Sequence, residues 1–190
     1  MDRTITPELQ QMYEKHVKQP SDINTHLPIL WKYASECDHI TELGVRDVVS
    51  TWAFLAAKPK KMISVDLLYN ANIELAKKIA ADNGIDFTFI QSDDIAIKLE
   101  ATDLIFIDTW HVYHHLKKEL DLHGNKSRKF LIFHDTVSCG VYGMPSPHEN
   151  AKPGNKGIWP AITEFLAIHP EWKMLTHIPT NNGLTVLNRG

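Results

Sequence analysis

Short apolar runs that end in an acidic residue recur five times along the chain. The runs are uniformly apolar, as at 104–107 (LIFI) and 130–133 (FLIF), rather than alternating with polar residues. Strands of this kind are buried on both faces of a sheet, as in parallel sheets. The acids that close the runs are Glu42, Asp66, Asp93, Asp108 and Asp135. Because the carboxyl ends of parallel strands share one edge, we expect these carboxylates to line one polar crevice.

Helical periodicity follows three of these acids. The apolar positions that share a helix face are Trp52, Leu55 and Ala56 after Glu42, then Ile73, Ala76 and Ala80 after Asp66, and Val112, Leu116 and Leu120 after Asp108. Strand, helix and strand in alternation predict a doubly wound α/β fold, with a mostly parallel sheet and helices on both faces. Gly84 is a candidate C-terminal cap for the second of these helices.

The two ends of the chain depart from this alternation. Thr6 followed by Pro7 is typical of a helix start, and a second helix is predicted over residues 23–35. Near the C-terminus, the apolar runs at 172–178 and 184–188 flank an Asn-Asn-Gly turn. They predict an antiparallel hairpin at the edge of the sheet.

Residues 138–157 form a long stretch without helix or strand signals. It is punctuated by Gly140, Gly143, Pro145, Pro147, Pro153, Gly154 and Gly157. A loop of this length in a compact domain is usually functional or disordered. We therefore expect it to cover a ligand site, with His148 and Glu149 as candidate contacts.

Composition indicates one soluble domain. With 190 residues and 43% hydrophobic content, the chain suits a single domain over 1–190, in which residues 1–35 are accessory helices. A net charge of -3 without a basic block excludes an electrostatic footprint for nucleic acid. No apolar stretch approaches the roughly 20 residues that span a bilayer, and no signal sequence is evident. The sequence predicts a cytoplasmic protein without membrane or nucleic-acid partners, its two cysteines reduced, and leaves a homo-oligomer open.

The segment ELGVRDVVST after the first predicted strand stands where a doubly wound protein binds its main ligand. It contains a single glycine, Gly44, so it matches neither G-x-G-x-x-G nor the phosphate-binding P-loop. A nicotinamide or nucleoside-triphosphate site is therefore poorly supported.

Taken in order, ITELGVRDVVST, ISVD, IQSDD, LIFIDTWH and LIFHDT resemble the class I S-adenosylmethionine-dependent methyltransferases. The chain is most similar to their metal-assisted branch of macrocin-type sugar O-methyltransferases and cephalosporin-hydroxylase-like proteins, and the closing GIWPAITEFL and NNGLTVL share that similarity. The resemblance runs from about Thr25 to the C-terminus. It implies a Rossmann-like seven-stranded sheet whose last strand is antiparallel.

The resemblance implies S-adenosylmethionine as the cofactor. The residues that it places around this cofactor are Glu42, Gly44, Ser50, Asp66, Ser92 and Asp93. Asp66 would accept hydrogen bonds from the ribose hydroxyls, a task suited to a fixed carboxylate. Ser92 and Asp93 would face the adenine, and the other three would border the methionine portion.

The turn after Gly44 departs from the pattern of the family. Relatives often carry a further glycine where this chain has Asp47, Val48 and Val49. The residues themselves also offer a second interpretation of Glu42 and Ser50, as groups that cap a helix and compensate its dipole. Both interpretations stay open for these two residues.

Asp108 and Asp135 close two strands that we expect to be neighbours. Two close carboxylates repel unless one is protonated or a cation lies between them, and Mg²⁺ suits oxygen ligands. By resemblance, Asp108, His134 and Asp135 occupy the positions of the family's metal ligands, although many relatives have an acid in place of His134. A histidine there shifts the preferred ion toward Mn²⁺ or another transition metal, or leaves a site of two carboxylates.

His111 matches the position at which some relatives carry a general base, and Asp108 is its predicted catalytic partner. Imidazole titrates near neutral pH and can take a proton from a hydroxyl that a metal has acidified. His114, His115 and His123 lie in or after the following helix. We expect these three to be surface residues.

Three functional hypotheses follow. The first is an S-adenosylmethionine-dependent O-methyltransferase that acts on a hydroxyl of a sugar, a glycan or a glycosylated small molecule, with a divalent metal, Mg²⁺ or Mn²⁺. The second is a metal-dependent hydrolase that uses Asp108, His134 and Asp135, which leaves Asp66 and Asp93 without a role. The third is a non-catalytic nucleoside-binding module, because a fold does not guarantee an activity.

Overall fold

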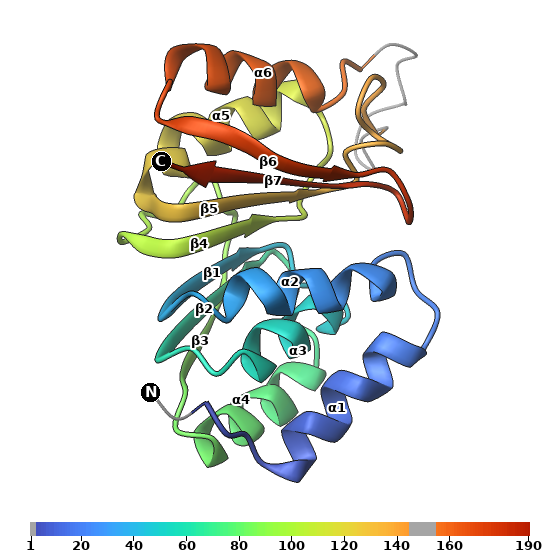
Figure 1. The fold of residues 1–190 in the computed structure, drawn as a ribbon, viewed down its shortest axis with the longest axis vertical. Helices are drawn as coiled ribbons and strands as arrows, with labels where there is room; N and C mark the ends of the chain where they lie inside the picture. The colour runs from blue at the N-terminus through green and yellow to red at the C-terminus, as the bar shows by residue number, and fades with distance from the viewer. Residues whose placement is uncertain (1–2, 145–154) are drawn as a thin grey trace.

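Seven strands form one sheet through the centre of the molecule (Figure 1). The computed structural model describes residues 3–144 and 155–190. The strands are β1 (His39–Leu43), β2 (Lys61–Asp66), β3 (Asp86–Gln91), β4 (Thr102–Ile107), β5 (Ser127–His134), β6 (Trp172–Ile178) and β7 (Leu184–Arg189). Their order in the sheet is β3-β2-β1-β4-β5-β7-β6, in which β1 to β5 are parallel and β7 is antiparallel to both β5 and β6. The predicted seven-stranded sheet and its terminal hairpin are confirmed, with β7 inserted between β5 and β6.

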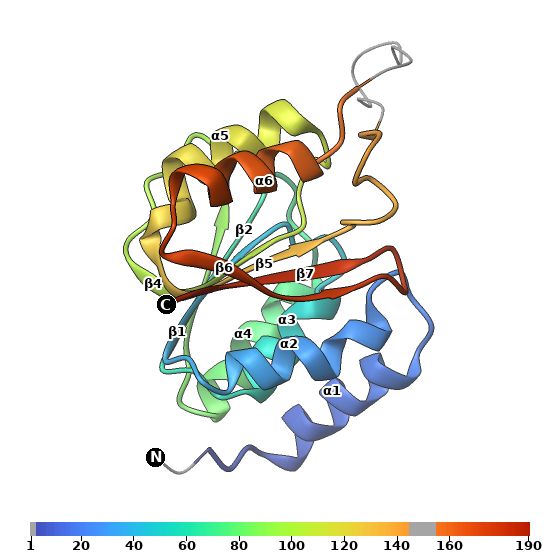
Figure 2. The same ribbon diagram turned by 45° about the horizontal axis from the view of Figure 1, so that its top comes forward.

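Helices cover both faces of the sheet (Figure 2). One face carries α1 (Pro7–Lys18), α2 (Leu27–Ala34), α3 (Val49–Ala56) and α4 (Asn72–Asp82), and the other carries α5 (Tyr113–His123) and α6 (Trp159–Ile168). Short 3-10 turns at Asn24–His26 and Gly124–Lys126 precede α2 and β5. The helix start predicted at Thr6 is confirmed, because its side chain accepts a hydrogen bond from the Leu9 N–H at 3.4 Å. None of the described helices has the length and hydrophobicity that crossing a bilayer requires.

The apolar strand runs fill two cores, one on each face of the sheet. Residues that pack toward α1 to α4 include Ile40, Met62, Leu104, Phe106 and Ile132. Residues that pack toward α5 and α6 include Leu43, Val65, Ile105, Ile107 and Leu131. Successive side chains of a strand point to opposite faces, so a strand covered on both faces must be apolar throughout. This explains why the central strands lack an alternating pattern.

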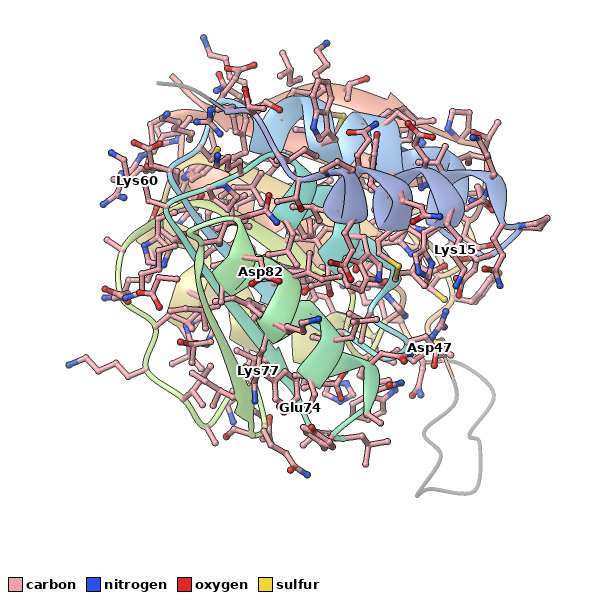
Figure 3. All side chains as sticks on the ribbon, turned by 90° about the horizontal axis from the view of Figure 1, so that it is seen from below. Lys15, Asp47, Lys60, Glu74, Lys77 and Asp82 are labelled. Atoms are coloured by element: carbon pink, nitrogen blue, oxygen red, sulfur yellow. The ribbon has the colours of Figure 1, made fainter. Side chains whose placement is uncertain are left out.

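The outer surface of α4 is charged. Figure 3 shows Glu74, Lys77 and Asp82 along this helix, and the Lys77 Nζ lies 2.9 Å from Glu74 Oε1. Ile73 and Ala76 of the same helix are buried against the core. The amphipathic pattern read from the sequence therefore corresponds to one buried and one solvent-facing side of α4.

Two connections that start at the carboxyl edge of the sheet contain irregular chain in their described parts. The linker 92–101 joins β3 to β4 through turns alone. The predicted loop 138–157 is described only in part, and residues 145–154, with His148 and Glu149, lie outside the described residues. Its described ends approach each other through a bridge between Tyr142 and Lys156. The described part of each connection begins next to a strand end that carries a predicted site residue.

Candidate active site

The five acids of the sequence pattern lie at or just beyond the carboxyl ends of β1 to β5. Glu42 is the penultimate residue of β1 and Asp66 the last of β2, whereas Asp108 and Asp135 directly follow β4 and β5. Asp93 comes two residues after β3. The shared edge is therefore present, but the surroundings of the five carboxylates differ.

Glu42 is fully buried beneath α3. Its carboxylate accepts hydrogen bonds from the hydroxyls of Ser50 (2.6 Å), Thr51 (2.9 Å) and Ser64 (2.6 Å). Burial raises the pKa of Glu42 to about 7, and the three hydroxyls oppose this effect without cancelling it. The arrangement ties β1 and β2 to the first turn of α3. It favours the supporting role of Glu42 and Ser50 over direct contact with a ligand.

The turn between β1 and α3 is held in an unusual backbone conformation. Arg46 and Val48 have φ angles of 44° and 67°, in the left-handed region that is strained for a β-branched residue. Gly44 also has a positive φ, and a Cβ there would lie 2.0 Å from the carbonyl oxygen of Asp108. Gly44 therefore lets the β1 turn pack directly on the end of β4.

Asp66 connects the turns that follow β1 and β2. Its Oδ2 accepts the N–H groups of Val45 (2.7 Å) and Arg46 (2.9 Å), and its Oδ1 accepts that of Leu68 (2.9 Å). Each carboxylate oxygen has two lone pairs, so Oδ1 retains an acceptor site for a ligand hydroxyl.

Ser92 and Asp93 lie beside Asp66. The backbone N–H of Ser92 donates to the carbonyl of Asp66 at 2.9 Å, and the Asp93 carboxylate accepts the Ile95 N–H at 3.1 Å. Both side chains are partly exposed. The structure thus brings together the residues predicted to face ribose and adenine, on the β2–β3 side of the crevice.

Asp108, His111 and Asp135 form a close group at the ends of β4 and β5. The His111 Nε2 is 3.0 Å from Asp108 Oδ1 and 3.3 Å from Asp135 Oδ2. One potential metal-ligating atom of each side chain lies within 4.8 Å of the others, a spacing that can hold a metal ion. The other ring nitrogen, Nδ1, is 3.2 Å from the Met144 Sδ. The predicted catalytic residues and two predicted metal ligands are therefore neighbours.

His134 lies behind this group, and its side chain is 1% exposed. Its Nδ1 is 3.3 Å from Asp108 Oδ1 and 3.5 Å from Asp135 Oδ2. Burial alone would lower the pKa of His134, but the two carboxylates outweigh it and raise the pKa to about 10. Burial would likewise raise the pKa of Asp108, but His111 and His134 hold it well below its usual range. An imidazolium at His134 thus supplies the cation that two close carboxylates require.

Sequence reasoning missed His26, which packs on His134. The two rings are in an edge-to-face arrangement with centroids 5.4 Å apart. Burial and the charge of His134 lower the pKa of His26 to about 4, so its ring is neutral. His26 belongs to the N-terminal helices, and no local motif connects it to a site more than 80 residues further along the chain.

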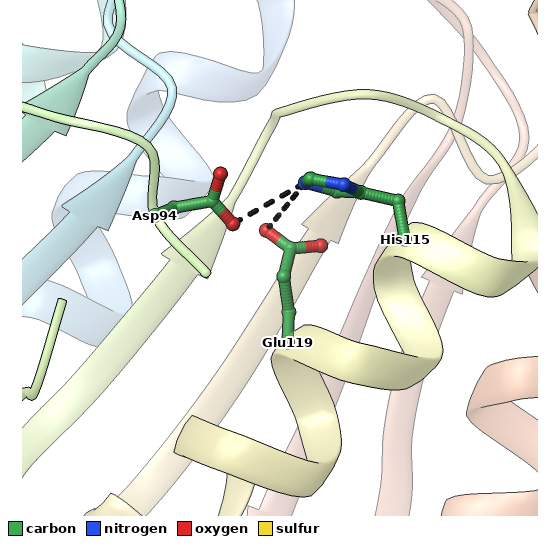
Figure 4. Close-up of side chains that lie close together, drawn as sticks. All are labelled: Asp94, His115 and Glu119. Atoms are coloured by element: carbon green, nitrogen blue, oxygen red, sulfur yellow. Dashed lines mark ion pairs between the residues drawn. The ribbon is translucent and has the colours of Figure 1, made fainter. Parts of the chain in front are cut away.

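A second group of two carboxylates and an imidazole lies beside α5 (Figure 4). The His115 Nε2 is 3.3 Å from Asp94 Oδ2 and 3.9 Å from Glu119 Oε1. Glu119 is fully buried and accepts the Thr109 hydroxyl at 2.8 Å. Burial and the nearby charge of Asp94 raise the pKa of Glu119 well above its usual value.

The prediction that His115 and His123 are surface residues is wrong. The His115 side chain is 12% exposed, and His123 is 2% exposed with its Nε2 2.8 Å from the Asp94 carbonyl oxygen. His114 is exposed, as predicted. The missed signal is the spacing of His115, Glu119 and His123, because residues four apart share one face of a helix. That face packs on the linker 92–101.

Solved structures of methyltransferases share this fold. An O-methyltransferase from Bacillus cereus in complex with SAH aligns with a TM-score of 0.62 and 13% identity over 98% of this chain and 92% of that chain. The SAH-bound methyltransferase PaMTH1 from Podospora anserina gives 0.59 and 17% over 98% and 89%. The N-methyltransferase NodS from Bradyrhizobium japonicum, with S-adenosyl-L-homocysteine, gives 0.58 and 12% over 95% and 98%. No family model and no curated protein matches the sequence.

At these identities the similarity establishes the fold alone. It confirms the Rossmann-like seven-stranded arrangement that the sequence resemblance implied. Because both O- and N-methyltransferases share the arrangement, the fold does not determine which atom accepts a group. Function has to be argued from the residues at the strand ends.

Proposed function

We propose that the protein is an S-adenosylmethionine-dependent O-methyltransferase, assisted by a divalent metal, whose acceptor is a hydroxyl of a sugar, a glycan or a glycosylated small molecule. The observation that carries the proposal is the group of Asp108, His111 and Asp135 at the ends of β4 and β5. The fold supports the cofactor, since structures with this fold contain SAH. The sequence resemblance to macrocin-type enzymes supports the sugar hydroxyl.

The β2–β3 side of the crevice fits the nucleoside part of the cofactor. Asp66 keeps one free acceptor site for a ribose hydroxyl, and Ser92 and Asp93 are hydrogen-bonded in place next to it. Leu67, directly after Asp66, is 63% exposed and offers apolar surface to a base. Gly44 brings the β1 turn against the end of β4, so the methionine part would lie next to the reaction group.

The reaction group fits a divalent cation. Asp108 and Asp135 would hold the ion through oxygen atoms, and the His111 Nε2 lies within 3.3 Å of both carboxylates. When bound, the ion would lower the pKa of an acceptor hydroxyl.

His111 is the residue that would receive the proton from the acceptor. His134 is already protonated at neutral pH, because its pKa is raised to about 10, and its buried ring cannot reach an acceptor. The Nε2 of His111 faces Asp108 and Asp135, so Nδ1 is the nitrogen left to accept a proton. The two carboxylates would orient this ring, and the chain would contribute chiefly by positioning the reactants.

The surface beside His111 suits a sugar ring. Val141 and Tyr142 are 66% and 76% exposed, and they precede Met144, which contacts His111. An exposed aromatic ring offers an apolar face together with a polar hydroxyl. An acceptor lying on Tyr142 would contact the chain two residues before Met144, which contacts His111.

The test separates cofactor binding from methyl transfer. Calorimetry with S-adenosylhomocysteine measures the first, and mass spectrometry of acceptors incubated with S-adenosylmethionine and Mg²⁺ or Mn²⁺ measures the second. We expect binding, and methylation of sugar hydroxyls in preference to phenols and amines. Binding without turnover on any acceptor would instead indicate a nucleoside-binding module, and absence of binding would contradict the proposal altogether.

Single substitutions test the reaction group. Asp108→Asn, Asp135→Asn and His111→Asn should each lower kcat/KM by about 10²–10⁴-fold, whereas the exposed His114→Asn should retain full activity. Chelator should suppress turnover of the wild type. Undiminished transfer in chelator would remove the metal from the proposal and leave His111 as the sole activating group.

A further inference from the structure

The second group, Asp94, His115 and Glu119, contains buried side-chain oxygen and nitrogen atoms that lack hydrogen-bond partners among the described residues. These atoms are Asp94 Oδ2, His115 Nε2 and Glu119 Oε2. The Glu119 side chain is fully buried and that of Asp94 is 10% exposed. Such groups are costly to bury unless they are paired or bind a metal.

The three side chains converge on one point. Figure 4 shows the Asp94 and Glu119 carboxylates directed toward the His115 ring from the linker and from α5. Although Asp94 Oδ2 and His115 Nε2 are 3.3 Å apart, no hydrogen bond joins them. Glu119 approaches His115 with Oε1, which accepts the Thr109 hydroxyl, and its second oxygen, Oε2, has no partner among the described residues, so the carboxylate retains acceptor capacity for an ion.

The spacing suits a small transition-metal ion. Zn²⁺ binds nitrogen and oxygen at about 2.0–2.1 Å, so neighbouring ligands of a tetrahedral site are about 3.3 Å apart. The Asp94–His115 distance is 3.3 Å, and Glu119 Oε1, 3.9 Å from the His115 Nε2, would move closer when an ion binds. One imidazole with two carboxylates favours Zn²⁺ or Mn²⁺ over Mg²⁺, which prefers oxygen ligands alone.

Further contacts hold these side chains in position. The Thr109 hydroxyl donates to Glu119 at 2.8 Å, and His123 fixes the backbone of Asp94 through its carbonyl oxygen at 2.8 Å. Hydrogen bonds to the side chains and backbone of metal-ligating residues orient those residues toward the ion. His115, Glu119 and His123 occupy one face of α5, so the helix presents a preformed surface to the linker 92–101.

We propose that Asp94, His115 and Glu119 form a metal site for a divalent transition ion, with Zn²⁺ preferred, separate from the Asp108–Asp135 group. The ion joins the linker 92–101 to α5 and thereby fixes a connection that contains no helix. The inference rests on the geometry of these three residues and stands whether or not the protein transfers methyl groups.

The experiment uses the full chain, freed of metal with chelator and then dialysed. Zn²⁺ is titrated by calorimetry, and Co²⁺ is added as a spectroscopic probe of tetrahedral coordination. His115→Ala and Glu119→Gln should each weaken Zn²⁺ binding at this site at least 10-fold and abolish its Co²⁺ absorption bands. In the wild type, Zn²⁺ at 100 times Kd should raise Tm by about 5–10 °C, and the two variants should lose this shift.

Two controls make the result specific. His114→Ala removes the neighbouring, exposed histidine of the same helix, and it should bind Zn²⁺ as the wild type does. Asp108→Asn disables the other carboxylate group and should leave the Co²⁺ bands of this site intact. Circular dichroism of each metal-free variant shows that it is folded, and Glu119→Gln preserves side-chain volume should His115→Ala unfold.

The proposal is overturned if His115→Ala and Glu119→Gln bind Zn²⁺ as tightly as the wild type. It is also overturned if only Asp108→Asn loses binding, or if His114→Ala weakens binding as much as His115→Ala does. A metal-free wild type that gains neither Zn²⁺ affinity nor thermal stability would show that a shared proton, rather than an ion, holds the three side chains together.

Discussion

Glu42 and Asp108 are strand-end acids on adjacent strands, β1 and β4, yet the pKa values of their carboxyl groups move in opposite directions. Glu42 is fully buried among three neutral hydroxyls, and its pKa rises to about 7. The side chain of Asp108 is 25% exposed and lies next to two imidazoles, and its pKa falls well below the usual range. Both acids obey the same sequence pattern of an apolar run closed by a carboxylate.

The comparison shows that the strand-end position and the neighbouring side chains contribute separately to the properties of each carboxyl group. The position brings each acid to the same edge of the sheet. Hydroxyl groups donate hydrogen bonds but carry no charge, whereas an imidazolium stabilises the ionised form directly. The β1 side therefore supports the fold with a carboxyl group that is partly protonated near pH 7, and the β4–β5 side holds the fixed charges that a cation or a general base requires.

Removing the imidazolium of His134 should have the largest effect. In His134→Ala, Asp108 and Asp135 lose the cation between them, and the free energy of unfolding should fall by about 3–5 kcal/mol. Urea denaturation at pH 7 in chelator measures the loss. The exposed His114→Ala should change stability by less than about 0.5 kcal/mol.

A double substitution distinguishes lost charge from lost packing at His134. If unpaired carboxylates cause the loss, adding Asp108→Asn to His134→Ala should restore part of the stability, because it removes one of the two charges. No recovery in the double variant would mean that His134 acts through packing alone. The contrast between the two strand-end acids would then have to be explained without an imidazolium.

Glu42 should make the protein less stable as pH rises, whereas a carboxyl group with a lowered pKa, such as that of Asp108, contributes in the opposite sense. Its folded-state pKa of about 7 lies above the ordinary value of 4.5, so the folded protein keeps a proton that the unfolded chain has released, and stability falls as pH rises between these values. Glu42→Gln removes this effect. Between pH 4.5 and pH 7.5, the stability of the variant relative to the wild type should therefore increase by up to about 3 kcal/mol.

The matched control for Glu42 is the exposed Glu36. The difference between Glu36→Gln and the wild type should stay nearly constant over the same pH range, as measured by chemical denaturation at each pH. If the Glu42→Gln difference is equally flat, Glu42 is ionised in the folded protein, and the two sides of the crevice do not differ in charge as we describe.

Apolar runs and helical periodicity were sufficient to predict the sheet and most of its helices, because burial on one or two faces leaves a direct mark on the sequence. The position of β7 between β5 and β6 was not predictable from such patterns. It depends on which strand of the hairpin pairs with β5. Residues Phe130 to Phe133 of β5 are apolar enough to pair with either strand.

The structure brings predicted site residues together where the end of a strand determines their position, as for Asp108 and Asp135. The group around Asp94 was missed because it depends on how α5 packs against an irregular linker, and linkers carry no periodic signal. The role of Ser64 was also hidden, since it reaches Glu42 only through the register between β1 and β2. The local sequence pattern determines which residues lie at the edge of the sheet. Contacts between different strands and helices can be identified only in the assembled structure.

The smallest expected effect concerns the turn between β1 and α3, which packs on the end of β4. Val48 has a φ of 67°, where glycine is favoured by about 1 kcal/mol over residues with a Cβ. Val48→Gly should therefore be more stable than Val48→Ala, although both lose buried methyl groups. At Val49, the first residue of α3, the order should reverse by a smaller amount, because alanine is the better helix former but the first turn makes few intrahelical hydrogen bonds. Thermal denaturation of the four variants tests this, and alanine preferred at both positions would mean that the turn carries no strain and that its shape depends on Gly44 alone.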